Sequence, residues 1–329
     1  MNIIVFGAGT FGTAIAKALS MNKENNVQLF SKNESKVNEI NTLNTNKSCF
    51  PNKHLPSSIC ATSNENEFSN ADIVFIAYPS TLIIKKIESV YHKFKDNVLI
   101  VNLSKGLLNG GVTVVDAIKQ NFEFDNIVTL KGPSFAVELM DHASTLLTLG
   151  YKTQKQFDIV NKVIRKTVLH IDFTNDIRGV EILSSLKNIY AIFLGIVDAK
   201  YNSSNTRFMM LTKAFSEVRL ILKELGGCES TLFLSCGFGD LCLTSLNDLS
   251  RNRTLGLLIG KEFYNEDYKS NSVILEGLSS INLIYNLVND NIIGQLPILV
   301  KLYNYFSGKT QDVDVFFNDF SNIQIVKKK

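Results

Sequence analysis

Hydrophobic positions in the first half of the chain come in short runs, and segments with helical spacing separate these runs. This alternation is typical of βαβ units. We predict strands at 3–6, 27–31, 73–77, 98–102 and 127–130, a further extended pair at 144–149 and 168–173, and a helix near 154–166 between that pair. The Asn-rich stretch 41–48 is predicted to be a surface loop.

From about Asp176 the strand-like runs stop and long helical periods follow. Helices are predicted at 178–197, 206–225, 229–235, 240–248, 251–260, 276–289 and 296–306. We therefore predict an α/β, Rossmann-like, doubly wound domain over residues 1–175 and an all-α domain over residues 176–329. Ligands of open α/β sheets bind beyond the carboxyl ends of the strands, so we expect the helical domain to close over that edge and to supply substrate contacts.

Length, charge and cysteine content narrow the possible functions. The 329 residues exceed a usual single core, and 45% hydrophobic with 20% charged residues describes a soluble globule. A net charge of +3 is too small to indicate nucleic acid or a membrane surface. We expect no membrane insertion, because no apolar run reaches spanning length and the N-terminus forms a strand rather than a signal peptide. Five cysteines without CxxC spacing indicate reduced thiols in a cytoplasmic protein.

The strand at 3–6 runs directly into a glycine-rich turn and then into a helical pattern. Gly7, Gly9 and Gly12 form a GxGxxG motif, and the order of strand, turn and helix makes this motif a strong signal. Gly7 permits the tight turn, Gly9 lets the backbone approach a pyrophosphate, and Gly12 lets helix and strand pack closely. A glycine turn without a ligand is the alternative. The context favours a dinucleotide, whose diphosphate would lie at the positive end of the helix.

Two further loops follow predicted strands and therefore belong to the binding edge of the sheet. Lys105 follows the strand at 98–102 and offers an ammonium to an anionic or carbonyl oxygen, with a solvated loop lysine as the alternative. Gly132 and Ser134 follow the strand at 127–130 and precede a helical run, which supplies free N–H groups and a hydroxyl. Helix capping is the alternative there. The position of both loops favours a functional role.

Lys187 lies beside Asn188 in a predicted helix that is apolar nearly all round and should be buried. A buried ammonium costs on the order of several kcal/mol unless it is paired or wetted. Its own helix face offers no carboxylate, so we expect a partner from another element. Burial should also lower the pKa of Lys187 toward the range of a proton donor. A lysine that snorkels from a narrow exposed strip is the alternative.

The helical half also carries Asp240 and, shortly after it, Ser250-Arg251-Asn252-Arg253. Asp240 alone would be a common helix N-cap. Ser250, Arg251 and Asn252 place a fork of donors at a helix start, which suits a phosphate. Only six of the 34 basic residues are Arg, so two within four residues indicate a task for which Lys does not suffice. A surface ion-pair patch is the alternative.

The end of the second predicted strand bears on cofactor choice. An Asp or Glu there would bind the ribose hydroxyls and favour NAD. This strand instead runs into Ser31-Lys32-Asn33, with no carboxylate before Glu34. Lys32 can meet a 2′-phosphate, so we expect NADPH or NADH as the cofactor, with NADPH preferred. The four histidines are scattered without ligand spacing, and we expect no metal.

Together and in this order, the motifs resemble the soluble NAD(P)-dependent glycerol-3-phosphate dehydrogenases of bacterial type. The resemblance covers nearly the whole chain and rests on Gly7-Ala8-Gly9-Thr10-Phe11-Gly12-Thr13, Ser104-Lys105-Gly106, Gly132-Pro133-Ser134-Phe135-Ala136, Leu186-Lys187-Asn188, Gly239-Asp240-Leu241, Ser250-Arg251-Asn252-Arg253 and Glu276-Gly277. It implies reversible hydride transfer that reduces dihydroxyacetone phosphate to sn-glycerol 3-phosphate, a precursor of glycerophospholipids. It also implies a homodimer.

The resemblance further implies a role for each matched residue. Lys187 resembles the proton acceptor and donor of the family. Substrate contacts are implied for Lys105, Gly132, Ser134, Lys187, Asp240, Ser250, Arg251 and Asn252. Cofactor contacts are implied for Gly7, Gly9, Thr10, Phe11, Gly12, Lys32, Lys105, Ala136, Arg251, Ile274 and Glu276. The chain departs from the family pattern at Thr212-Lys213-Ala214, where Thr-Arg-Gly is usual, and at Leu234-Ser235-Cys236.

Two other functions stay open on the sequence alone. A 3-hydroxyacid or 6-phosphogluconate-type dehydrogenase shares the two-domain plan and a Lys-Asn helix, but Ser250-Arg251-Asn252 argues against it. A catalytically silent NAD(P) sensor would use the helical domain to bind a partner. Such a sensor need not keep Lys187, Lys105 and Asp240 together.

Overall fold

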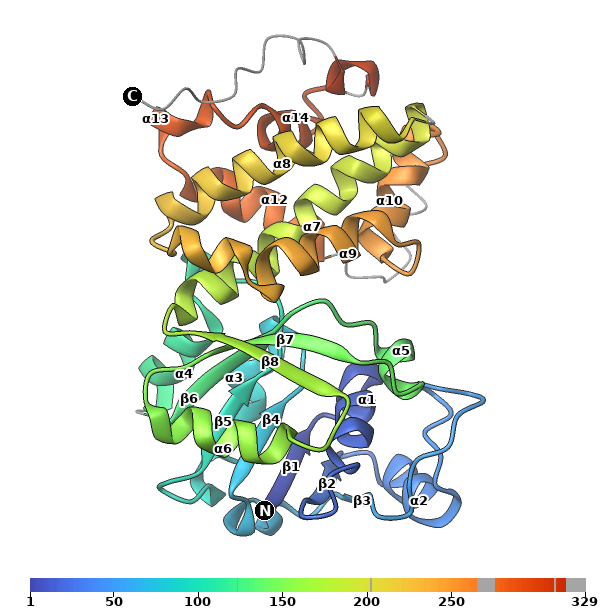
Figure 1. The fold of residues 1–329 in the computed structure, drawn as a ribbon, viewed down its shortest axis with the longest axis vertical. Helices are drawn as coiled ribbons and strands as arrows, with labels where there is room; N and C mark the ends of the chain where they lie inside the picture. The colour runs from blue at the N-terminus through green and yellow to red at the C-terminus, as the bar shows by residue number, and fades with distance from the viewer. Residues whose placement is uncertain (123, 202, 265–275, 311, 318–329) are drawn as a thin grey trace. The chain divides into compact units, whose positions relative to one another are not determined.

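The structure is a computed structural model that describes residues 1–329 except 123, 202, 265–275, 311 and 318–329 (Figure 1). The chain divides into a first unit of Met1–Leu108 with Val112–Glu181 and a second unit of Asn109–Gly111 with Ile182–Lys329. The division falls inside helix α7 (Ile177–Lys200), near its start. The expected domain boundary between residues 175 and 176 stays a prediction about which segments fold on their own.

One mixed sheet of eight strands organises the first unit, in the order β3-β2-β1-β4-β5-β6-β7-β8. Neighbouring strands are parallel except for the antiparallel pair β6 and β7. The strands are β1 (Asn2–Phe6), β2 (Asn26–Phe30), β3 (Cys60–Thr62), β4 (Ile73–Ile76), β5 (Leu99–Asn102), β6 (Ile127–Lys131), β7 (Thr145–Gly150) and β8 (Leu169–Thr174). The doubly wound α/β prediction is confirmed. Only β3 is new, because three residues are too few to show an alternation.

Apolar layers bury both faces of this sheet, as a mainly parallel sheet requires. Successive side chains of a strand point to opposite faces, so β1 sends Ile3 and Val5 into one core and Ile4 and Phe6 into the other. The first core is covered by α1 (Thr10–Leu19), α2 (Glu34–Leu43), α5 (Ala136–Met140) and α6 (Gln154–Ile164), and the second by α3 (Ser80–Glu88) and α4 (Val114–Phe122).

The stretch 41–48 is not the surface loop that we expected. Helix α2 continues to Leu43, and the chain then turns inward, so that Thr45 and Asn46 are buried. Burial is tolerated because their polar groups find partners inside the unit. The Thr45 hydroxyl donates to Glu39, and the Asn46 amide donates to the Thr13 hydroxyl, both at 2.9 Å.

The described part of the second unit is all-α, as predicted. Its helices are α7, α8 (Ser204–Glu224), α9 (Asp240–Leu246), α10 (Arg251–Gly260), α12 (Glu276–Leu287), α13 (Asp290–Ile293) and α14 (Pro297–Phe306). The segment predicted at 229–235 is a 3₁₀ helix over Glu229–Phe233, and the short α13 was not predicted.

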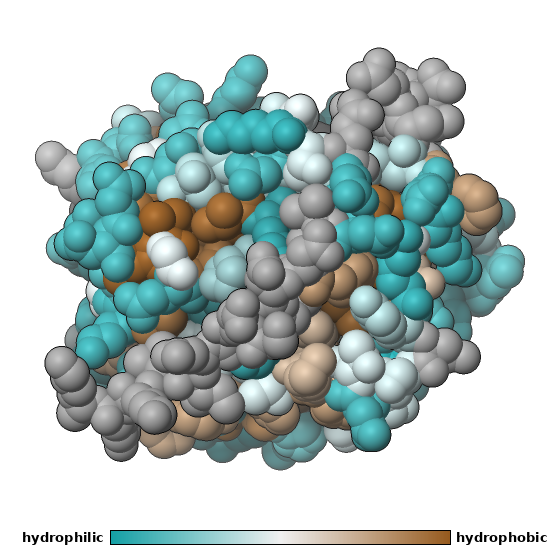
Figure 2. Space-filling model, turned by 90° about the horizontal axis from the view of Figure 1, so that it is seen from above, coloured by the Kyte–Doolittle hydropathy of each residue, from teal (hydrophilic) through white to brown (hydrophobic). Residues whose placement is uncertain are grey.

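Figure 2 shows one face of the protein, where hydrophobic side chains gather in groups between hydrophilic ones.

We expected no apolar run of membrane-spanning length, and helix α7 shows that this expectation was wrong. By length and composition, α7 is long and apolar enough to cross a membrane. Its most apolar stretch is entirely buried within the protein. The core helix of a folded domain has the same composition, since such a helix is apolar on every side. Length and hydropathy therefore do not indicate a membrane span here.

Helices α7 and α10 meet with no side chain between them. A Cβ added at Gly195 of α7 would lie 2.3 Å from the carbonyl oxygen of Arg253. One added at Gly256 of α10 would lie 2.0 Å from the carbonyl oxygen of Ile192. Real Cβ atoms do not approach backbone this closely, so glycine is required at both positions. This contact lies in the middle of α10, which begins at Arg251.

A buried carboxyl group joins three helices of the second unit. Glu217 of α8 accepts hydrogen bonds from the backbone N–H groups of Ile298 (2.7 Å) and Leu299 (3.1 Å) in α14, and from the Tyr190 hydroxyl of α7 (3.0 Å). Burial outweighs these donors and raises the pKa of Glu217 to about 8. The pKa is lower in the unfolded chain. The contribution of Glu217 to stability is therefore complete only at acidic pH and is lost as the pH rises toward 8.

Gly256→Ala should destabilise the second unit by about 2–3 kcal/mol, because the new methyl group would overlap the Ile192 carbonyl and force the helices apart. Gly294→Ala is the matched control, since a Cβ at Gly294 meets nothing within 4 Å and its backbone is helical at φ −64°. Thermal melting of both variants tests this. Equal melting temperatures would mean that the crossing has room for a side chain.

Candidate active site

The glycine-rich turn between β1 and α1 has the geometry of a cradle. Gly7 has φ +123°, and a Cβ there would lie 2.8 Å from the carbonyl oxygen of Ala77. A Cβ at Gly12 would lie 1.9 Å from the carbonyl oxygen of Gly7, whereas one at Gly9 would meet nothing within 4 Å. The loop is thus closed on the protein side and open at Gly9. Thr10 starts α1, and no side chain caps the helix, so the N–H groups at its N-terminus can donate to an anion.

Three side chains outside the motif hold this loop through the carbonyl oxygen of Ala8. Lys36 Nζ donates to it at 3.1 Å, Asn46 Nδ2 at 3.2 Å, and the Cys49 thiol at 3.7 Å. None of the three was predicted from the sequence. Asn46 carried no signal beyond its place in a polar stretch, since its partners are distant in the chain.

The loops after β5 and β6 carry Lys105, Gly132 and Ser134. Lys105 is half-buried, and the preceding Ser104 is fixed by its backbone N–H, which donates to Asn102 Oδ1 at 2.9 Å. Gly132 has φ +155°. The Ser134 hydroxyl donates to the Gly132 carbonyl oxygen at 3.1 Å, and the N-cap of α5 is the next residue. Ser134 is therefore not the helix cap that was the alternative interpretation. Ala136 begins α5 and is half-buried.

A buried carboxylate that the sequence analysis missed ties the ends of β5 and β6 together. Glu181 accepts hydrogen bonds from Asn102 Nδ2 (2.5 Å), the Thr129 hydroxyl (2.9 Å) and the backbone N–H of Val115 (3.1 Å). It also lies 3.8 Å from the ammonium of Lys131, whose side chain is fully buried. Two loops with candidate binding residues, those of Lys105 and Gly132, begin directly after these strands.

Lys187 lies in the middle of α7 with a side chain only 5% exposed, so the snorkelling alternative is wrong. Its partner comes from another element, as the sequence analysis required. Asp240, the first residue of α9, faces Lys187 Nζ at 2.5 Å, and the Thr244 hydroxyl one turn later accepts from Nζ at 3.1 Å. Thr244 was missed, because nothing near it in the chain distinguishes it from a helix-surface threonine. The three groups form one buried polar cluster.

Two hydrogen bonds bring the starts of α10 and α12 together beside α7. Asn188 Nδ2 donates to Glu276 Oε2 at 3.2 Å, and the backbone N–H of Gly277 donates to Asn252 Oδ1 at 3.3 Å. Asn188 was recognised with Lys187 but not assigned to the site. Ile274, expected to contact the cofactor, lies outside the described residues.

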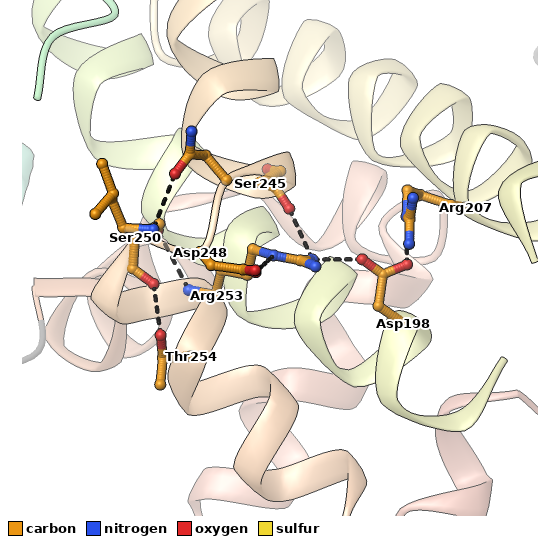
Figure 3. A network of polar contacts seen from close by, with 9 residues as sticks. Asp198, Arg207, Ser245, Asp248, Ser250, Arg253 and Thr254 are labelled. Carbon is orange, nitrogen blue, oxygen red and sulfur yellow. Dashed lines mark hydrogen bonds and ion pairs between the residues drawn. The ribbon is translucent and has the colours of Figure 1, made fainter. Parts of the chain in front are cut away.

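The two arginines at the start of α10 have different environments. Ser250 caps the helix, accepting from the backbone N–H of Arg253 at 3.3 Å, and Arg251 is exposed. Arg253 is buried instead, and its guanidinium pairs with Asp198 and Asp248 and donates to the carbonyl oxygen of Ser245, as Figure 3 shows. Arg253 therefore anchors α10, while Arg251 lies exposed at the start of the helix.

Arg207 completes this network from α8. Its Nε lies 2.5 Å from the second carboxylate oxygen of Asp198 (Figure 3). Asp198 thus links three helices of the second unit, because it lies on α7 and its two partners lie on α8 and α10. Neither Asp198 nor Arg207 was singled out from the sequence.

Lys32, the residue expected to favour NADPH, follows β2 and lies 2.8 Å from Glu65 Oε1. The side chains are 50% and 34% exposed. Phe11, in the first turn of α1, is half-buried and packs against the core of the first unit. The structure therefore places the predicted cofactor residues Gly7, Gly9, Thr10, Phe11, Gly12, Lys32 and Ala136 on the first unit, and Arg251 and Glu276 on the second.

Comparison with known proteins agrees with this arrangement. Residues 2–157 match the family described as NAD-dependent glycerol-3-phosphate dehydrogenase N-terminus, and residues 176–316 match the corresponding C-terminus. The chain belongs to the NAD-dependent glycerol-3-phosphate dehydrogenase family. The resemblance stated from the sequence motifs is thereby confirmed.

Relatives of this dehydrogenase family match the chain over nearly its whole length. It is 33% identical to glycerol-3-phosphate dehydrogenase, NAD(P)+, of Methanothermobacter thermautotrophicus over 323 residues, 97% of each chain. It is 30% identical to the protein of that name from Thermoanaerobacter over 313 residues, 94% of each. Glycerol-3-phosphate dehydrogenase of Plasmodium falciparum has the same fold, with a TM-score of 0.88 at 21% identity over 99% of this chain and 97% of that one.

Arg253→Lys should lower the stability of this dehydrogenase by about 2 kcal/mol, because an ammonium cannot reproduce the fork whose Nε holds Asp248 while its Nη1 holds Asp198 and the Ser245 carbonyl oxygen. Arg251→Lys is the matched control, since Arg251 is exposed and should leave stability unchanged. Melting temperatures of both variants decide the matter. A loss in Arg251→Lys equal to that in Arg253→Lys would contradict the division of roles.

Proposed function

We propose that this protein reduces dihydroxyacetone phosphate to sn-glycerol 3-phosphate with NAD(P)H in the cytoplasm, and so supplies glycerophospholipid synthesis. The observation that carries the proposal is the buried cluster of Lys187, Asp240 and Thr244 in a chain of the glycerol-3-phosphate dehydrogenase family. A buried ammonium held by a carboxylate is suited to stabilise developing negative charge and to give up a proton.

The first unit would hold the cofactor. The open cradle at Gly9 leaves room for a pyrophosphate against the N-terminus of α1, whereas the Cβ of any residue other than glycine would collide at Gly7 and Gly12. When bound, the cofactor supplies a hydride. Thr10, Phe11 and Ala136 would contact it from the same unit, and Arg251 and Glu276 from the second.

Lys187 would donate the proton. Reduction of the C2 carbonyl develops an alkoxide, which the ammonium stabilises before protonating it. Asp240 is the positioning partner, because its carboxylate holds Nζ in place and offsets the cost of burying the ammonium. Thr244, also bonded to Nζ, restricts the direction in which the ammonium can move.

The substrate phosphate would bind Arg251 and Asn252, with Ser250 at the same helix start. This remote binding energy orients C2 for transfer. Lys105, Gly132 and Ser134 would supply further substrate contacts from the loops after β5 and β6. Lys105 would also contact the cofactor.

We propose that NADPH is accepted and preferred, because Lys32 can meet a 2′-phosphate after a strand that ends without a carboxylate. We also propose a homodimer without nucleic acid or membrane partners. Exposed Phe208, Phe233 and Phe238 of the second unit support contact between copies, and the mass in solution tests this.

Turnover of NADPH or NADH with dihydroxyacetone phosphate is the deciding experiment. A related 3-hydroxyacid or 6-phosphogluconate-type dehydrogenase would turn over its own substrate class instead. A silent NAD(P) sensor would bind the cofactor without oxidising it.

Lys187→Ala should lower kcat by about 10²–10⁴-fold, the range for loss of a general acid, and should leave cofactor affinity near that of the wild type. Lys200→Ala is the matched control on the same helix, because Lys200 pairs with Glu262 and Asp314 near the surface. Cofactor titration and melting temperature show whether the variant is folded. A folded Lys187→Ala variant that keeps most of its kcat would remove Lys187 from the mechanism.

Arg251→Lys should lower kcat/KM for dihydroxyacetone phosphate, because a bidentate phosphate contact becomes a point charge. The loss should correspond to about 2–3 kcal/mol of transition-state stabilisation. The melting temperature should stay constant, as argued above. Steady-state kinetics over a range of substrate concentrations measure the change. Unchanged kinetics would exclude Arg251 from the phosphate site.

A further inference from the structure

A cation and an anion face each other where β2 and β3 end. The two strands are parallel neighbours, with Phe30 beside Thr62, so the residues that follow them emerge at one edge of the sheet. Lys32 follows β2, and Glu65 begins the 3₁₀ helix Glu65–Asn70 after β3. Lys32 Nζ lies 2.8 Å from Glu65 Oε1, and both side chains remain accessible to solvent.

This edge is where a dinucleotide places the ribose of its adenosine half in an open α/β sheet, beside the end of the second strand. An acidic residue on that strand commonly binds the ribose hydroxyls. The strand lacks one here, but Glu65 brings a carboxylate to the same place from the neighbouring strand. The other nearby lysine, Lys36, points to the glycine loop, where its Nζ donates to the carbonyl oxygen of Ala8.

We propose that Glu65 is a specificity-determining residue that limits the preference for NADPH by pairing with Lys32. The inference rests on the proposed function, since it concerns the cofactor of that reaction. A 2′-phosphate must draw Lys32 away from Glu65 and then lies close to the carboxylate. A ribose with a free 2′-hydroxyl leaves the pair intact. Lys32 alone would favour NADPH more strongly than Lys32 paired with Glu65.

The size of the effect follows from the exposure of the pair. Exposed ion pairs are weak, because water and salt screen both charges. Loss of the Glu65 charge should therefore raise the ratio of affinities for a 2′-phosphorylated over an unphosphorylated adenosine ligand by about fivefold. The gain should shrink at high ionic strength.

The test uses two cofactor fragments that undergo no reaction, adenosine 2′,5′-bisphosphate and 5′-AMP. Calorimetric titration of the full chain gives both affinities for the wild type, Glu65→Gln, Lys32→Met and the double variant. We expect Glu65→Gln to raise the affinity ratio about fivefold, and to raise it far less when Lys32 is already Met. Glu34→Gln is the matched control, because it removes the same charge two residues from Lys32 at an exposed position.

Three results would overturn the inference: an unchanged ratio in Glu65→Gln, an equal rise in Glu34→Gln, or an equal rise in the Lys32→Met background. The last would mean that Glu65 acts on the phosphate without the pair. Fragment binding does not depend on turnover. A shifted ratio without reduction of dihydroxyacetone phosphate would therefore contradict the proposed function alone, and an unshifted ratio with full turnover would contradict only the role of Glu65.

Discussion

The ion pair between Lys187 and Asp240 is the constraint around which the second unit is arranged. An ammonium with 5% of its side chain exposed loses most of its hydration, and a nearby carboxylate must compensate for that loss. Asp240 can do so only if α9 begins within hydrogen-bonding distance of the middle of α7. The apolar surroundings that make α7 a core helix are thus the same surroundings that make a partner for its lysine necessary.

A buried charge with a compensating partner recurs at two other places, and neither of them is proposed to contact the substrate. Lys131 pairs with Glu181 beneath the loops after β5 and β6, and Arg253 pairs with Asp198 at the start of α10. Each pair is buried and carries further hydrogen bonds, so each fixes the backbone from which candidate binding residues project. Burial and pairing therefore do not distinguish Lys187, which is proposed to act on the substrate, from Lys131 and Arg253, which support the backbone. All three are buried and paired.

The sequence predicted the strands to within one residue at each end apart from β3, because buried parallel strands are continuous apolar runs with clear ends. It also predicted the glycine cradle, since a positive φ and a close approach each demand glycine. Asn46, Glu181 and Thr244 were missed for one reason: the contact that gives each its place is made with a residue far away in the chain, Ala8, Asn102 and Lys187 respectively. The residue pattern by itself did not tell Arg251 from Arg253, and only the family resemblance assigned a contact to Arg251 alone. Two positions on a helix differ by direction, and the packing of α7 and α8 shows which direction is inward.

The contact between Gly195 and Gly256 has a consequence for how this protein can evolve. Most packed positions tolerate exchange, because a larger residue on one helix can be matched by a smaller one on the other. No residue is smaller than glycine, so neither helix holds a compensating substitution for its partner. Sequence drift around this crossing can therefore change the flanking side chains but not the crossing itself. Descendants of this chain must inherit both glycines together or change how α7 and α10 pack.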